Sequence, residues 1–234
     1  CCSYKLQLYR TDNFAQNDYS KALDYFKKSL KLDLSFFGEN HPSVASGYYN
    51  IGYVYFAQGD YSKALEYFEE VLKIRLSVYG ENHSRVASVY NDIGEIYSVQ
   101  GDDFKALDYF KKSLKIVLSV YGENHSQVSS IYDHIGEIYF AQKDYSKALY
   151  YFEESLKIRL SLFGENHPEV ALSYYSIGSL YIIQGDKSKA LNYYEKSLKI
   201  RLSVYGENHP LTKEIMDLIN VANSKVLQSP ETTK

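Results

Sequence analysis

The tetrapeptide Gly38-Glu39-Asn40-His41 occurs four more times in the chain, beginning at Gly80, Gly122, Gly164 and Gly206. Each copy starts 42 residues after the one before it. A period this strict is typical of repeat proteins, in which each unit packs mainly on its neighbours. It predicts a stack of similar units whose hydrophobic core continues from one unit to the next. The extended surface of such a stack binds other proteins far more often than it catalyses a reaction.

One period contains two stretches with the apolar spacing of amphipathic helices, illustrated by residues 44–57 and 61–79 of the second unit. Between them, Gly59 suits the left-handed position after a helix, and Asp60 suits the N-cap of the next one. Each unit is therefore predicted to be a helix, a tight turn, a longer helix and a loop. Strand patterns are absent from the sequence.

The same reading applies along the chain. The first helix of a unit is expected near residues 44–57, 85–99, 127–141 and 169–183, and the second near 19–37, 61–79, 103–121, 145–163 and 187–205. Residues 1–16 align with a first helix, although Tyr9-Arg10 stands where other units have Ile-Gly. Lys143 replaces one turn glycine, which should add a little strain.

These units predict one repeat domain over residues 1–227. Its units are about 1–42, 43–84, 85–126, 127–168 and 169–210, followed by a polar capping helix at 211–227 and a tail at 228–234. Because the sequence begins with Cys1 and not Met, we expect it to be a fragment of a longer protein.

The pattern Tyr48-x-x-Ile51-Gly52-x-x-Tyr55, followed by Ala64-x-x-x-Phe68, resembles the tetratricopeptide (TPR) signature with Tyr in place of its Trp. It recurs in three further units, as Tyr90, Ile93, Gly94, Tyr97, Ala106 and Phe110; as Tyr132, Ile135, Gly136, Tyr139, Ala148 and Phe152; and as Tyr174, Ile177, Gly178, Tyr181, Ala190 and Tyr194. The resemblance implies an all-α fold, a right-handed superhelical solenoid of antiparallel helix pairs. The 42-residue form with Gly-x-x-His-Pro-x-Val-Ala is similar to the repeats of kinesin light chains, which implies a partner-binding module lined by the first helices.

The composition of the chain excludes several classes of partner and location. A net charge of −3 argues against nucleic acid, because phosphate recognition needs a basic face. No apolar run approaches the length that spans a membrane. Cys1 and Cys2 are the only cysteines and are adjacent, which excludes a disulfide framework and agrees with a cytoplasmic location.

Catalytic, cofactor and metal sites are not expected. The chain has no phosphate-binding glycine loop, nucleophile elbow, Cys/His pair or zincin motif. The signature histidines occur once per repeat, about a helix diameter apart, whereas zinc ligands lie about 2 Å from one ion. Loop and capping roles are therefore predicted for the five histidines, His41, His83, His125, His167 and His209.

The resemblance places the partner-binding groove on the first helices. The candidate residues there are Tyr49, Asn50, Tyr53, Phe56, Asn91, Asp92, Glu95, Asp133, His134, Glu137, Phe140, Tyr175, Ser179 and Ile182. Kinesin light chains resemble one another in an Asn-Asn pair here and in bases that accept acidic peptides. This chain keeps Asn50 and Asn91 but has no Lys or Arg at these places. The alternative, that these side chains are only solvated, is left open.

Charge predicts the character of the partner. We expect Asp92 and Glu95 to lie beside Asp133 and Glu137, with no base nearby on the first helices, and with aromatic side chains at both flanks. Such a face would accept a basic and apolar segment of a protein or peptide. The predicted function is a protein-binding scaffold or adaptor. The alternative is a regulatory or sensor arm of a larger signalling protein, such as an NTPase. The sequence leaves the oligomeric state open.

Overall fold

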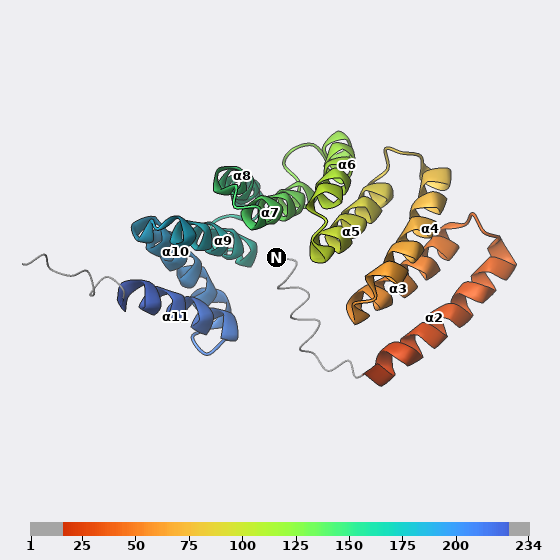
Figure 1. Ribbon diagram of the computed structural model, residues 1–234, viewed down its shortest axis with the longest axis horizontal. Helices are drawn as coiled ribbons and strands as arrows, with labels where there is room; N and C mark the ends of the chain where they lie inside the picture. The colour runs from red at the N-terminus through yellow and green to blue at the C-terminus, as the bar shows by residue number, and fades with distance from the viewer. Residues whose placement is uncertain (1–15, 225–234) are drawn as a thin grey trace, which may run out of the picture. The chain divides into compact units, whose positions relative to one another are not determined.

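The computed structural model describes residues 16–224, and within this range every regular element is an α-helix. The helices follow one another along the chain with short connections, as Figure 1 shows. They are α2 (Gln16–Phe37), α3 (Pro42–Gln58), α4 (Tyr61–Tyr79), α5 (Ser84–Gln100), α6 (Asp103–Tyr121), α7 (Ser126–Ala141), α8 (Tyr145–Phe163), α9 (Pro168–Gln184), α10 (Lys187–Tyr205) and α11 (Pro210–Ser224).

The chain divides after Gly122 into two compact units, and we describe each by itself. In the part of the chain that the structure describes, unit 1 contains α2 to α6 and unit 2 contains α7 to α11. The boundary falls inside the predicted repeat 85–126, directly after α6. The prediction of one domain over residues 1–227 stays a prediction.

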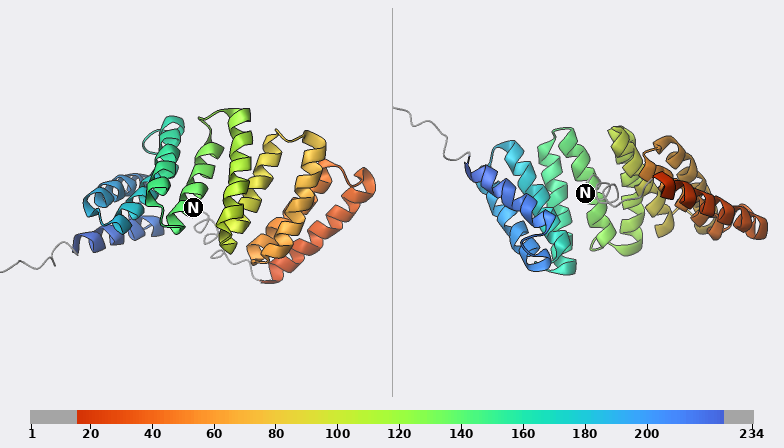
Figure 2. Two further views of the ribbon diagram at one scale, coloured as in Figure 1. Left: turned by 45° about the horizontal axis from the view of Figure 1, so that its top comes forward. Right: turned by 90° about the horizontal axis from the view of Figure 1, so that it is seen from below.

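Within each unit, the helices form antiparallel pairs of a first helix, here called the A helix, and a second helix, the B helix. The pairs are α3 with α4 and α5 with α6 in unit 1, and α7 with α8 and α9 with α10 in unit 2. Both views in Figure 2 show these pairs side by side within their unit. α2 is a B helix and α11 is an A helix. The predicted all-α repeat array is confirmed.

The turn within a pair is formed as predicted. Gly59 has a φ of 80°, and its N–H donates to the carbonyl oxygen of Phe56. The Asp60 side chain accepts a hydrogen bond from the Lys63 N–H at the start of α4. Lys143 takes the equivalent left-handed position in unit 2 with a φ of 63°, so the turn keeps its shape without glycine.

A helices approach their own B helices closely at one glycine per pair. In unit 1, a Cβ atom added to Gly94 of α5 would lie 2.9 Å from the Phe110 ring of α6. Beside this contact, the Tyr109 ring stacks on Tyr97 at 5.6 Å and tilts against Tyr90 at 5.9 Å. The same triplet of tyrosines occurs in the other pairs, which explains the recurrence of Tyr in the sequence: Tyr48, Tyr67 and Tyr55; Tyr132, Tyr151 and Tyr139; Tyr174, Tyr193 and Tyr181.

The two ends of the array differ from its middle. Residues 1–15 of the predicted initial A helix lie outside the described residues, and Gln16 belongs to α2. α2 also continues through residues 17 and 18, where the other pairs have their turn. At the other end, α11 confirms a helix after the last pair, while residues 225–234, including the predicted tail, lie outside the described residues.

Candidate partner-binding surface

All fourteen predicted binding residues lie on A helices. Unit 1 holds those of α3 and α5, and unit 2 holds those of α7 and α9. Asn50, Tyr53 and Ile182 are exposed, and most of the others are partly buried. The predicted proximity of the α5 and α7 carboxylates involves both units and stays a prediction.

The exposed part of the surface in unit 1 combines aromatic and polar groups. Tyr53 of α3 is 40% exposed and its ring lies 6.5 Å from that of Phe56. On α5, the Asn91 side-chain amide donates to Glu95 Oε1 at 2.8 Å. Glu95 is therefore held in position by its own helix. Unit 1 therefore offers a partner both an aromatic side chain, Tyr53, and a carboxylate, Glu95.

Beneath this surface in unit 1 lies a buried acidic group. Oδ2 of Asp92 is buried without a hydrogen-bond partner, although the residue as a whole is only partly buried. Burial, and secondarily the charge of Glu95, raise the pKa of Asp92 to about 8, and Tyr49 and Arg75 act in the opposite direction. Burial, and then Asp92, also raise the pKa of the Tyr49 hydroxyl. The Asp92 carboxyl is thus largely protonated at neutral pH, and it adds less negative charge than the sequence indicates.

In unit 2 the structure contradicts the solvent-facing position predicted for Asp133. Asp133 is buried, and its Oδ2 lies 2.7 Å from a guanidinium nitrogen of Arg159 on α8. Arg159 also contacts Glu169 of α9 at 3.0 Å and donates to Ser173 Oγ at 2.7 Å. Burial raises the pKa of Asp133, and the Arg159 charge opposes this effect. The prediction concerned bases on the A helices only, and the base that pairs with Asp133 comes from a B helix.

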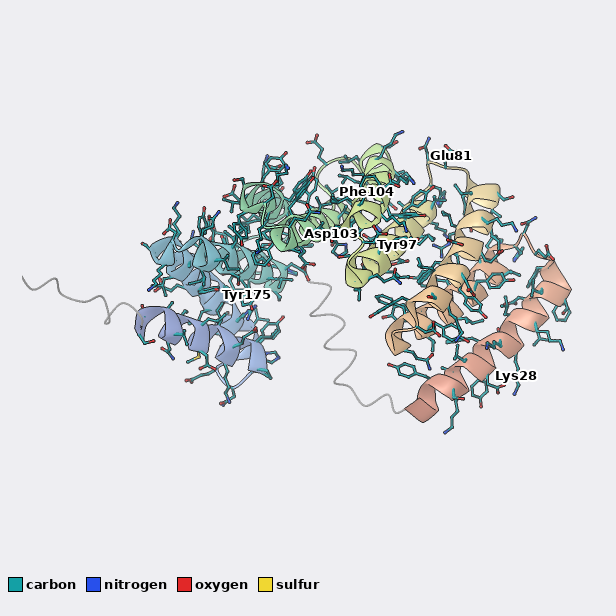
Figure 3. All side chains as sticks on the ribbon, viewed as in Figure 1. Lys28, Glu81, Tyr97, Asp103, Phe104 and Tyr175 are labelled. Carbon is teal, nitrogen blue, oxygen red and sulfur yellow. The ribbon has the colours of Figure 1, made fainter. Side chains whose placement is uncertain are left out.

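Tyr175 of α9, labelled in Figure 3, is held in a similar way. The Arg201 guanidinium of α10 lies 5.0 Å from the Tyr175 ring centroid, and the Tyr175 hydroxyl donates to Glu214 Oε1 of α11 at 3.0 Å. Burial and then Glu214 raise the pKa of Tyr175 to about 12. Nearby, Ser179 accepts a hydrogen bond from the Tyr194 hydroxyl at 3.2 Å. Tyr175 and Ser179 therefore serve the packing of α9 as well as its surface.

The sequence interpretation missed the arginines of the B helices. Arg75, Arg159 and Arg201 each reach from a B helix toward its own A helix and the next one: Arg75 lies over the Tyr49 ring and donates to the Arg85 carbonyl oxygen, and Arg201 donates to the Leu211 carbonyl oxygen. The signal was available, because these arginines share one position of the 42-residue period, where α6 has Val117. They link successive A helices within a unit.

The signature histidines act as caps, as predicted. Nδ1 of each accepts a hydrogen bond from the N–H two residues later, at 3.1 to 3.2 Å, at the start of an A helix. Signature histidine rings also stack on the last aromatic residue of the preceding B helix, for example in the pairs Phe37–His41, Tyr79–His83, Phe163–His167 and Tyr205–His209. In residues 16–224, no group of three His, Cys, Asp or Glu side chains could hold a metal ion.

Comparison with known families agrees with this geometry. The tetratricopeptide repeat model matches residues 11–77, 44–116, 85–161 and 127–203 in overlapping segments. The chain belongs to the tetratricopeptide repeat family. A search of curated proteins found no match. In the described part of this TPR protein, no helix is both long enough and apolar enough to cross a bilayer.

Solved structures show the same fold. BtubC (BKLC) from P. vanneervenii matches with a TM-score of 0.71 and 17% identity, over 92% of this chain and 95% of that one. A putative kinesin light chain of Podosopora anserina, with nearly identical TPR-like repeats, gives a TM-score of 0.67 at 17% identity, over 87% and 96% of the two chains. MamA gives 0.55 at 19% identity, over 80% and 91%. These similarities show that the chain has the fold of a TPR array.

Proposed function

We propose that this TPR protein is a non-catalytic scaffold or adaptor of the cytoplasm that binds a segment of another protein on its A helices. The observation that carries the proposal is the surface of the A helices. Tyr53 is 40% exposed on α3, and Ile182 and Ile183 are 38% and 50% exposed on α9. Side chains of this size gain affinity when a partner covers them.

The charges of the same surface favour a partner segment that is both basic and apolar. Glu95 in unit 1 and Glu137 in unit 2 are partly buried acidic groups on A helices. Asp92 adds little to their charge at neutral pH, because its pKa is raised to about 8. Asp133 no longer contributes to this argument, because Arg159 compensates its charge. A Lys or Arg of the partner would pair with Glu95 or Glu137 and lie against aromatic rings such as Tyr53.

A peptide-array screen tests this function. We expect the wild-type chain to select basic, apolar peptides, and a Glu95→Lys, Glu137→Lys double variant to lose them. The matched control is Glu66→Lys, Glu195→Lys, which makes the same charge change at exposed positions of B helices, one in each unit. Selection of acidic peptides by the wild type, or equal losses in both double variants, would refute the proposed surface. Binding should also weaken as salt is raised.

A further inference from the structure

In unit 1, one carboxyl group of the A helices is buried beneath the proposed binding surface. Asp92 lies on α5, and its Oδ2 atom is buried without a hydrogen-bond partner. Burial is the main reason that the pKa of this carboxyl is raised to about 8. An ionised carboxylate in such a place costs more free energy than a protonated one. Asp92 therefore gains a negative charge only when its surroundings become more favourable to one.

The groups that act on Asp92 come from α3, α4 and α5. Tyr49 of α3 hydrogen-bonds the carboxyl, and Arg75 of α4 favours its ionised form. Glu95 of α5 opposes ionisation through its own negative charge. α6 also packs on α5, and its titratable groups there have other neighbours: Tyr109 lies against Tyr90 and Tyr97, Lys105 pairs with Asp102, and Lys112 pairs with Asp108.

Glu95 connects the buried carboxyl to the binding surface. It follows Asp92 by three residues, so both side chains lie on one face of α5. After burial, the charge of Glu95 is the largest effect that raises the pKa of Asp92. The Asn91 amide donates to Glu95 Oε1 at 2.8 Å and holds that charge in place. A cation that pairs with Glu95 would therefore cancel part of the effect that keeps Asp92 protonated.

Unit 2 lacks this arrangement. Three residues before Glu137, its sequence has His134 and not a carboxyl group. The buried carboxyl of the same helix, Asp133, already pairs with Arg159 at 2.7 Å. A carboxyl that is buried, lacks a basic partner at hydrogen-bond distance and lies one helical turn from a surface glutamate is thus a feature of unit 1.

We propose that the binding of a partner's basic side chain at Glu95 makes Asp92 release a proton, after which the two carboxylates attract the same cation. This inference rests on the proposed function and specifies the chemistry of its partner. The cation pairs with Glu95, the Asp92 carboxyl loses H⁺ to the solvent, and its new charge strengthens the attraction. The partner residue is an arginine or a lysine, because a histidine would lose its own charge in the pH range where Asp92 ionises.

Isothermal titration calorimetry of the full chain at pH 7.5 counts the released protons. The probe is the basic, apolar peptide that binds most strongly in the array, made with arginine as its basic residue. Titrations in phosphate and in Tris, which differ in their heats of ionisation, should show release of about half a proton per peptide. This value corresponds to a fall in the pKa of Asp92 from about 8 to about 7. A copy of the peptide with citrulline, which is uncharged and similar in size to arginine, should bind more weakly and release no proton.

The affinity between pH 6 and pH 9 gives a second readout. The association constant of the wild type should rise about tenfold over this range and become constant above the pKa of Asp92. Asp92→Asn should remove the rise, because an amide cannot ionise. Asp108→Asn is the matched control and should keep the rise, since Asp108 is an exposed carboxylate that pairs with Lys112. Circular dichroism checks that both variants remain folded.

The outcomes separate this inference from the proposed function. An array without basic peptides would refute both. A peptide that binds the wild type, is lost in Glu95→Lys and releases no proton would leave the function intact and overturn the coupling alone. Binding that survives Glu95→Lys would place the peptide elsewhere and also overturn the coupling. A pH dependence that persists in Asp92→Asn would assign the proton to another group, such as His134, and overturn the role of Asp92.

Discussion

At the scale of single residues, the signature histidine joins two helices. His41 accepts the Ser43 N–H through Nδ1 and stacks on Phe37, with ring centroids 4.3 Å apart. His41→Ala should lower the free energy of unfolding by about 1–2 kcal/mol, since it removes a cap and an aromatic contact. His41→Asn keeps an acceptor at the cap and should lose less. Denaturant unfolding measures both. Equal losses for Ala and Asn would mean that the cap contributes nothing.

Asp92 gives the protein a pH dependence with a defined sign. Its pKa is raised to about 8 in the folded protein, against about 3.9 in an unfolded chain. Between these values the folded protein holds a proton that the unfolded chain has lost, so Asp92 lowers stability as pH rises from about 4 to 8 and has no further effect above that. The groups that face it are Tyr49 of α3, Arg75 of α4 and Glu95 on its own helix.

Asp92→Asn should remove this dependence, because the amide cannot ionise. We expect the variant to become more stable than the wild type as pH rises, by up to about 5 kcal/mol at pH 8 for a shift of this size, and the difference to vanish toward pH 4. Urea unfolding at several pH values measures it. Asp108→Asn is the control, since Asp108 is exposed and pairs with Lys112 on its own helix. A difference between Asp92→Asn and wild type that stays constant from pH 4 to 8 would contradict the assignment.

At the scale of the elements, the turn between α7 and α8 carries local strain. Lys143 has a φ of 63°, a region that side chains with a Cβ rarely adopt, while the equivalent Gly59, Gly101 and Gly185 have φ near 80°. Lys143→Gly should therefore raise the free energy of unfolding by about 1 kcal/mol, measured by denaturant unfolding. Lys187→Gly, at the first residue of α10, is a control that should destabilise instead. A loss of stability in Lys143→Gly would show that the lysine contributes more than its backbone costs.

Helix positions were largely predictable because their end signals are local. The B helices α4, α6, α8 and α10 have the bounds expected from an N-cap aspartate and a terminal glycine, and the A helices extend one or two residues beyond theirs. The exception is α2, which starts at Gln16 and not at residue 19. Asn17 replaces the turn glycine there, so the sequence lacks the residue that ends an A helix most readily.

At the scale of the whole molecule, the repeat and its family were evident from the sequence, while the properties of the binding surface were only partly so. The period places each candidate residue on an A helix, because helical spacing is a local property. The burial of Asp133 could not be predicted from helical spacing, since it depends on Arg159 of another helix. The arginine positions share the period, but their partners change from Tyr49 to Asp133 to Tyr175, and only packing shows this.

The central claim is that a partner segment binds the A helices, and photo-crosslinking tests it most directly. A benzophenone amino acid is placed at Tyr53 or Ile182 on A helices, or at Phe104 or Tyr150 on B helices, all exposed positions. Each variant is irradiated with a basic, apolar peptide selected in the array. The account predicts cross-links at one or both A-helix positions and at neither B-helix position. Cross-links confined to Phe104 or Tyr150 would contradict it.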